Sequence, residues 1–154
     1  VQARFLLAGD LDANNPSGFN SDDLKKINKD DCVEILGYQN DISILYEKSH
    51  IVCLPSYREG LPKGLLEAAS CKLPLISTNV PGCREICKNN FNGFLVKPKD
   101  SESLAKSIER LIFDERLMKK FGANSRKLVQ QRFSADIVFK NFLGVYREVL
   151  KKDP

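Results

Sequence analysis

The sequence predicts a three-layer α/β/α domain, in which helices cover both faces of a parallel β-sheet. Short, continuously apolar runs alternate with segments of helical periodicity along the chain, and such alternation builds βαβ units with parallel strands. The runs lack the polar alternation of strands that have one face in water, so helices should cover both faces of the sheet. A chain of 154 residues is about one domain long, and we expect residues 1–154 to form a single domain.

The first expected elements are a strand, a loop, a short helix and a second strand. The apolar run over 4–9 ends in Gly-Asp, as a buried strand entering a loop does. Residues 10–20 are rich in Asn, Asp, Pro, Ser and Gly and are therefore a loop. Ser21 and the two aspartates after it suit the start of a short polar helix. The run over 32–37 predicts the second strand.

The middle of the chain predicts two further strands, each next to a helix. Asp41 can cap a helix that carries Ile42, Leu45 and Tyr46 on one face. The run over 51–55 is the third strand. Residues 61–71 follow as a helix with proline near its first turn, and residues 73–77 form the fourth strand.

The last third of the chain is mainly helical. Pro81-Gly82 is a turn before a short helix that ends near Lys88, and residues 89–93 are a second turn before a short strand over 94–96. Three helices should follow over 101–113, 115–131 and 134–151. Their aromatic residues fall near helical spacing and are expected to be core or packing residues: Phe121, Phe133, Phe139, Phe142 and Tyr146.

Composition excludes several classes of protein. Nine Gly and seven Pro are ordinary numbers, and no apolar run approaches the 18 residues of a membrane span. Lys and Arg together number 24 against 20 Asp and Glu, so the formal net charge is only +4. No basic stripe with interleaved aromatics accompanies that charge, and we expect no nucleic-acid partner. The excess of Lys and Arg near the C-terminus fits a solvated helix face or attraction to an anionic lipid surface or to phosphate groups.

The five cysteines are too few for a disulfide scaffold of this length. Cys83 and Cys87 lack the spacing of a zinc site, and we expect no metal and no bound cofactor. Cys53 sits in an apolar run and should be a small core residue. Reduced thiols throughout point to a cytoplasmic protein.

The segment over 54–67 carries the richest chemistry, because it follows the third strand and ligands bind beyond the carboxyl ends of strands in open parallel sheets. Gly60 permits a tight turn and the close approach of a ligand. Pro62 suits the first helical position, where the free amides and the helix dipole favour a phosphate. Lys63 can add a full positive charge. Ser56, earlier in the loop, could either bind the ligand or close a turn.

Two carboxylates flank this helix start. Glu67, about one turn into the helix, can accept two hydrogen bonds from a ribose diol. Glu59, before the helix, can accept hydrogen bonds from a second sugar on the other side of the phosphates. The spacing alone equally allows two solvated carboxylates around an ordinary turn between strand and helix.

This frame, with Glu59 and Glu67 enclosing Gly-Leu-Pro-Lys-Gly-Leu-Leu, resembles the signature of the retaining glycosyltransferases of family 4 and their GT-B relatives. The resemblance continues along nearly the whole chain, in the family's order and spacing. Its other segments are Leu-Leu-Ala-Gly-Asp over 6–10, Ile-Leu-Gly-Tyr over 35–38, Val-Cys-Leu-Pro-Ser over 52–56, Leu-Pro-Leu-Ile-Ser-Thr over 73–78, Val-Pro-Gly-Cys-Arg-Glu over 80–85, Asn-Gly-Phe-Leu-Val over 92–96 and Arg-Phe-Ser over 132–134.

The resemblance implies the C-terminal, donor-binding half of a GT-B fold, a Rossmann-like sheet. By analogy, Glu59 touches the transferred sugar, the backbone around Gly60, Leu61 and Pro62 holds sugar and diphosphate, and Glu67 binds ribose. The loop with Tyr38 and Gln39 would border the base. The donor would be a nucleotide-diphospho-sugar, most simply UDP-linked, used without a metal.

The same resemblance implies a glycan or lipid-linked acceptor, and possible peripheral association of the full enzyme with the cytoplasmic face of the membrane. Two other interpretations stay open: a nonenzymatic nucleotide-binding module, which does not need Glu59, and a GT-B epimerase.

The sequence departs from the family pattern at several places. Leu61-Pro62 replaces the commoner Phe-Gly, and Lys72 replaces a usual glycine, which we interpret as a surface variation. The family's first strand, with its phosphate-binding Arg and Lys, has no counterpart before Arg4, and neither has the acceptor-binding N-terminal domain. We therefore expect the isolated chain to be inactive, and either to pair its strands across the gap or to self-associate through the open sheet edge.

Overall fold

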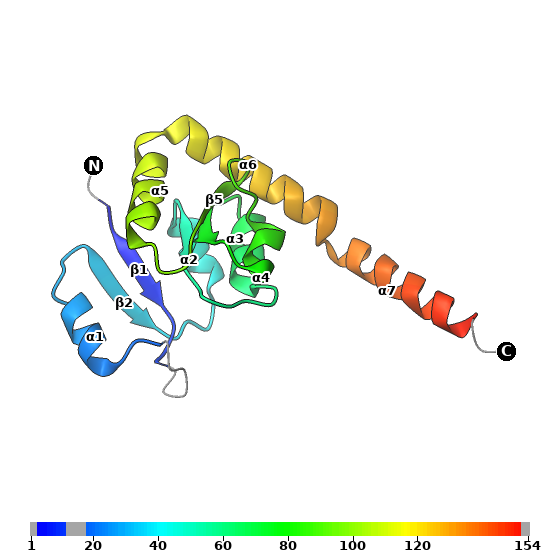
Figure 1. The fold of residues 1–154 in the computed structure, drawn as a ribbon, viewed down its shortest axis with the longest axis horizontal. Helices are drawn as coiled ribbons and strands as arrows, with labels where there is room; N and C mark the ends of the chain where they lie inside the picture. Colours follow the sequence, from blue (N-terminus) through cyan, green and yellow to red (C-terminus); the bar gives the residue numbers. More distant parts are fainter. Residues whose placement is uncertain (1–2, 12–17, 152–154) are drawn as a thin grey trace. The chain divides into compact units, whose positions relative to one another are not determined.

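The computed structural model describes residues 3–11 and 18–151, which fall in two compact units (Figure 1). The first unit lies within Val1–Ile42 and the second within Ser43–Pro154. Most of the loop expected over 10–20 falls outside the described residues. No helix in the described part of the chain is long and apolar enough to cross a membrane.

The first unit contains β1 (Phe5–Ala8), α1 (Ser21–Ile27) and β2 (Val33–Gly37). The two strands are parallel, and Phe5 pairs with Val33. Asn20 is the N-cap of α1: its side chain accepts from the amides of Asp22 and Asp23, and the Asp23 carboxylate accepts from the Asn20 amide at 3.2 Å. This reciprocal pair satisfies donors that a helix start otherwise leaves open, so the helix begins where the sequence predicts.

Within the first unit, β1 is only partly covered. Phe5 and Leu6 keep 45% and 38% of their surface exposed, although their run is continuously apolar. The reason lies in α1, a short polar helix without a buried residue.

The second unit is built on a three-stranded parallel sheet. Its strands are β3 (Val52–Leu54), β4 (Leu75–Thr78) and β5 (Gly93–Val96), in the order β3-β4-β5. Among the described residues, β1 and β2 pair in the first unit, and β3, β4 and β5 form the sheet of the second unit. The helices of this unit are α2 (Ser43–Lys48), α3 (Lys63–Ser70), α4 (Pro81–Ile86), α5 (Ser101–Phe113), α6 (Glu115–Arg132) and α7 (Ala135–Leu150).

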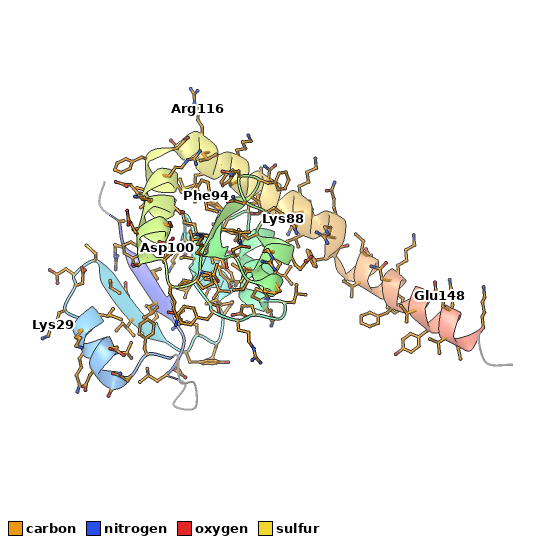
Figure 2. The ribbon with its side chains drawn as sticks, viewed as in Figure 1. Lys29, Lys88, Phe94, Asp100, Arg116 and Glu148 are labelled. Carbon is orange, nitrogen blue, oxygen red and sulfur yellow. The ribbon has the colours of Figure 1, made fainter. Side chains whose placement is uncertain are left out.

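Helices cover both faces of this sheet, and the expected three layers are present in the second unit. Alternate residues of a strand point to opposite faces. Leu75 joins α3 and α4 in one core cluster, while its neighbour Ile76 joins residues of α5 and α6 in the other. In the second cluster Phe94, which is labelled in Figure 2, packs edge-to-face with Phe121, and their ring centroids are 5.3 Å apart.

Cys53 is exposed, so its predicted place in the core is wrong. It is aligned across the sheet with Ile76 and Phe94 and shares their face. The helix α5 packs on β4 and β5, and the edge strand β3 is left less covered on that side. The other four cysteines are also free thiols, as expected.

The aromatic residues expected in the core divide between two helices. Phe121 on α6 is buried, as predicted. On α7 a place in the core is wrong for Phe139, Phe142 and Tyr146, which are all more than half exposed, and none of the residues of α7 is buried. Helical spacing predicted the apolar face correctly, but spacing does not reveal what covers that face.

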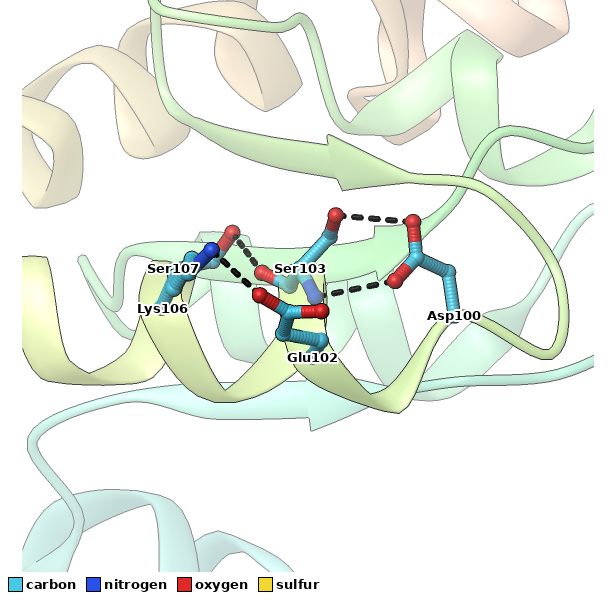
Figure 3. Close-up of polar contacts among 5 residues, drawn as sticks. All are labelled: Asp100, Glu102, Ser103, Lys106 and Ser107. Carbon is cyan, nitrogen blue, oxygen red and sulfur yellow. Dashed lines mark hydrogen bonds and ion pairs between the residues drawn. The ribbon is translucent and has the colours of Figure 1, made fainter.

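A hydrogen-bonded cap fixes the start of α5 (Figure 3). The Asp100 carboxylate accepts from the amide of Ser103 at 3.0 Å and from its hydroxyl at 2.7 Å. These bonds favour the ionised carboxylate and lower the pKa of Asp100 below its usual value. One turn later Lys106 pairs with Glu102, and the Ser107 hydroxyl donates to the Ser103 carbonyl. The loop from β5 is thereby anchored to α5.

Lys72 is more than a surface variation, because its backbone is left-handed, with φ of 61°. It follows the C-cap of α3, Cys71. The Lys72 amide donates to the Ala69 carbonyl, and the Leu73 amide donates to the Ala68 carbonyl. This pair of bonds is a Schellman motif, which favours glycine at the position of Lys72.

We expect Lys72→Gly to raise the free energy of unfolding by about 1 kcal/mol, because glycine adopts positive φ without steric cost. Urea unfolding of wild type and variant measures the change. Lys97→Gly is the matched control: Lys97 is exposed and its φ is not positive, so glycine there should lower stability. A loss of stability in Lys72→Gly would contradict the explanation.

Candidate functional site

The candidate site is the loop between β3 and α3 together with the first turns of α3, a segment of the second unit that contains seven of the predicted residues. Ser56, Glu59, Gly60 and Leu61 precede the helix, and Lys63 is its first residue. Pro62 is the N-cap of α3, one position earlier than predicted, and its ring supplies no side-chain cap for the first amides. An N-terminus without a side-chain cap keeps donors for a bound anion, which the helix dipole also favours.

Buried hydroxyls of β4 anchor this loop. The Ser77 hydroxyl donates to the Leu54 carbonyl at 2.8 Å, and the Thr78 hydroxyl donates to the Ser56 carbonyl. Both β4 residues are at most 2% exposed. The Ser56 hydroxyl donates to the Arg58 carbonyl at 3.3 Å, which corresponds to the turn role that the sequence left open.

Gly82 brings the first turn of α4 against the same loop. A Cβ atom at this position would lie 2.2 Å from the Gly60 carbonyl oxygen and 2.5 Å from that of Glu59. Real Cβ contacts are never this short, so only glycine allows the two backbones to approach in this way. The sequence predicts a turn at Gly82 and carries no signal of its contact with the candidate site.

The two carboxylates have different surroundings. Glu59 is half-buried, and no hydrogen bond or ion pair to its side chain is present among the described residues. Glu67 is the fifth residue of α3, and each of its oxygens has a partner. Lys63 Nζ lies 3.4 Å from Oε1, and the Tyr46 hydroxyl lies 3.3 Å from Oε2. Glu67 is therefore held in place, while the Glu59 carboxylate is available for a ligand.

Tyr46 reaches this site from α2. Its hydroxyl is 3.2 Å from the Gly64 carbonyl in the first turn of α3, in addition to its contact with Glu67. Burial, reinforced by the Glu67 charge, raises the pKa of Tyr46 to about 12. The phenol therefore remains protonated and can donate throughout the neutral range. The sequence placed Tyr46 on a helix face without indicating this contact.

Tyr38 and Gln39 belong to the first unit, directly after β2. The Tyr38 amide donates to the Asp10 carboxylate at 3.0 Å, and the Tyr38 ring is 69% exposed. The side-chain amide of Gln39 donates through Nε2 to the Leu36 carbonyl at 2.8 Å. Gly37, with φ of 62°, turns the chain at this point. Both predicted residues thus follow the carboxyl end of a parallel strand, the kind of position where such sheets bind ligands.

The fold and the candidate site define a class: an α/β domain with a parallel sheet, in which the segment from the β3–α3 loop into α3 combines an anion-favouring helix start with two acidic side chains. Residues 2–128 match the family model described as "Glycosyl transferases group 1". The chain belongs to this family, and its fold is that of part of a GT-B glycosyltransferase, which confirms the resemblance noted in the sequence.

Three known proteins illustrate the relationship. The capsular polysaccharide biosynthesis glycosyltransferase CapM of Staphylococcus aureus is 30% identical over 149 residues, which are 97% of this chain and 39% of CapM. The UDP-Gal:alpha-D-GlcNAc-diphosphoundecaprenol alpha-1,3-galactosyltransferase of Escherichia coli is 31% identical over 130 residues, which are 84% of this chain and 33% of that enzyme.

Among solved structures, the C-terminal domain of the glycosyl transferase group 1 family protein LpcC from Francisella tularensis is 29% identical, with a TM-score of 0.67. The match covers 74% of this chain and 62% of that one. The chain thus spans about two-fifths or less of the length of the two curated relatives.

Proposed function

We propose that the chain is the donor-binding part of a retaining glycosyltransferase. The complete enzyme moves a hexose or N-acetylhexosamine from a nucleotide-diphospho-sugar to a glycan or lipid-linked acceptor in polysaccharide biosynthesis. One observation carries the proposal: an unpartnered, half-buried Glu59 and a held Glu67 stand on either side of the uncapped start of α3. A nonenzymatic nucleotide-binding module does not need the Glu59 carboxylate.

Each residue of the loop has a role in this proposal. Gly60, Leu61 and Pro62 bring backbone close to the sugar and the diphosphate. The first amides of α3 and the Lys63 ammonium stabilise phosphate charge. Glu67 accepts from the ribose hydroxyls, and Tyr38 and Gln39 border the base.

We propose a UDP-linked donor, because the name of the E. coli relative gives UDP-Gal as its donor. The acceptor of that relative is a diphosphoundecaprenol-linked sugar, and CapM is named for capsular polysaccharide biosynthesis. We extend both features to the complete protein, which would work in the cytoplasm, at the membrane face where lipid-linked acceptors are reached.

The proposed chemistry separates a sugar from its diphosphate on the face at which the acceptor attacks. Negative charge grows on the leaving diphosphate, and fixed donors at the helix start stabilise it. The diphosphate oxygen helps to take the proton from the acceptor hydroxyl. Glu59 fixes the sugar through its hydroxyls and is not assigned as a nucleophile. The transfer needs no metal, so turnover should persist in EDTA.

Ligand binding by the full-length protein tests the proposal. Thermal shift with UDP, GDP, ADP and NAD should show selective stabilisation by UDP, since a ligand at 100 times its dissociation constant adds about 2.7 kcal/mol. UDP-hexoses should then be hydrolysed or transferred. Equal stabilisation by NAD would contradict the glycosyltransferase assignment and favour a nucleotide-binding module. Epimerisation of the sugar would contradict it in favour of an epimerase.

A further inference from the structure

We infer that Tyr46 is a positioning residue of the donor site, one that holds the Glu67 carboxylate in the orientation required to accept a ribose diol. This inference rests on the proposed function. It begins from the geometry of α2 and α3: the Tyr46 hydroxyl lies 3.3 Å from Glu67 Oε2 and 3.2 Å from the Gly64 carbonyl oxygen. These contacts span 21 and 18 positions in the sequence, so only the tertiary structure creates them.

The hydroxyl carries one proton, and both of its neighbours are acceptors. The carboxylate is the stronger acceptor because it is charged. A carboxylate has about four lone-pair positions. Tyr46 occupies one on Oε2 and Lys63 approaches one on Oε1, which leaves about two for a pair of adjacent hydroxyls. The number of remaining acceptor positions matches a ribose diol.

Tyr46 is the stronger of the two anchors. Its ring is half-buried and packs against the core cluster that contains Leu65 and Ala68 of α3. The Lys63 side chain is 88% exposed, and exposed ion pairs stabilise weakly because water screens them and flexible side chains lose entropy. The tyrosine is therefore rigid where the lysine is mobile, and it fixes Glu67 before the ligand arrives.

Binding of UDP to the full-length protein tests this inference, with four proteins measured by calorimetry: wild type, Tyr46→Phe, Glu67→Ala and the double variant. Phenylalanine keeps the ring and removes only the hydroxyl. We expect Tyr46→Phe to weaken UDP binding roughly tenfold, about the contribution of one hydrogen bond to a charged group. In the Glu67→Ala background the same change should have no further effect, because no carboxylate remains to be held.

The ligand dUDP, which lacks the 2′-hydroxyl, provides a second readout. The loss caused by Tyr46→Phe should be smaller with dUDP than with UDP, since one of the bonds to Glu67 is already absent. Tyr146→Phe is the matched control: this tyrosine is 63% exposed on α7, and its variant should bind UDP as the wild type does.

The outcomes separate the inference from the proposed function. If Glu67→Ala weakens binding and Tyr46→Phe does not, the positioning role is wrong and the donor site stands. If Tyr46→Phe weakens binding equally in both backgrounds, its effect is a general structural one and the inference is overturned. If Glu67→Ala binds UDP like the wild type, the ribose assignment fails, and the role of Tyr46 fails with it.

Discussion

Gly82→Ala is expected to lower glycosyl transfer about 100-fold and to destabilise the fold by about 1–3 kcal/mol. The new Cβ would stand 2.2 Å from the Gly60 carbonyl oxygen and 2.5 Å from the Glu59 carbonyl oxygen. Both are backbone atoms, so either the first turn of α4 or the Glu59–Gly60 segment must move. Overpacking of this kind costs about 1–3 kcal/mol, and a displacement of about 1 Å at a reacting site can cost 100-fold in rate.

Turnover and thermal unfolding of the full-length variant check this prediction together. Gly144→Ala is the control, since a Cβ at Gly144 meets nothing within 4 Å and alanine favours the helix that contains it. It should match or exceed the wild type in stability and keep its activity. Wild-type turnover in Gly82→Ala would mean that the close approach has no role in placing the site.

Glu59→Gln is expected to reduce kcat/KM for sugar transfer by about 100-fold or more, while the stability of the fold changes by less than about 0.5 kcal/mol. The side chain has no hydrogen bond or ion pair among the described residues, so the native fold loses no polar contact. In the proposed complex, in contrast, the carboxylate accepts bonds from the transferred sugar. Loss of a charge-assisted bond costs about 1.5–3 kcal/mol, and misorientation of the sugar adds to this.

Steady-state kinetics with a UDP-sugar and an acceptor, together with urea unfolding, measure both quantities. Glu85→Gln is the matched control: its carboxylate makes an exposed contact with Arg132 at 3.5 Å, outside the loop of the candidate site. A Glu59→Gln enzyme with full activity would remove the sugar-binding role from this residue.

Local sequence patterns predicted the positions of the helices and strands well. They predicted less well which faces of these elements are covered by other parts of the protein. Apolar runs identified the five strands found among the described residues, and the residues around Pro62 predicted the start of α3 to within two positions. The exposure of Phe5 and Phe139 was not predicted, because periodicity reports which face is apolar and does not report what lies against it. The exposure of apolar residues that the short helix α1 leaves uncovered, and of those on α7, depends on the tertiary structure alone.

The candidate site was predictable where its residues are close in sequence. Glu59 and Glu67 belong to one strand–loop–helix segment, so their spacing carried the information. Gly82 and Tyr46 contact that segment from α4 and α2. No local signal distinguishes a glycine that allows a close approach from a glycine in a turn, or a tyrosine that holds a carboxylate from one that only packs. Lys72 is an intermediate case. The family resemblance showed that glycine is usual at this position, and the positive φ of Lys72 explains why glycine is favoured there.

The most direct measurement compares the affinity of the full-length wild type, Glu59→Gln and Glu67→Gln proteins for UDP and for UDP-galactose. If the two side chains contact opposite ends of the donor, Glu67→Gln weakens both ligands by the same factor, and Glu59→Gln weakens UDP-galactose while UDP binds as before. Unchanged affinity in both variants, or a Glu59→Gln variant that loses UDP as strongly as UDP-galactose, would contradict this arrangement of the site.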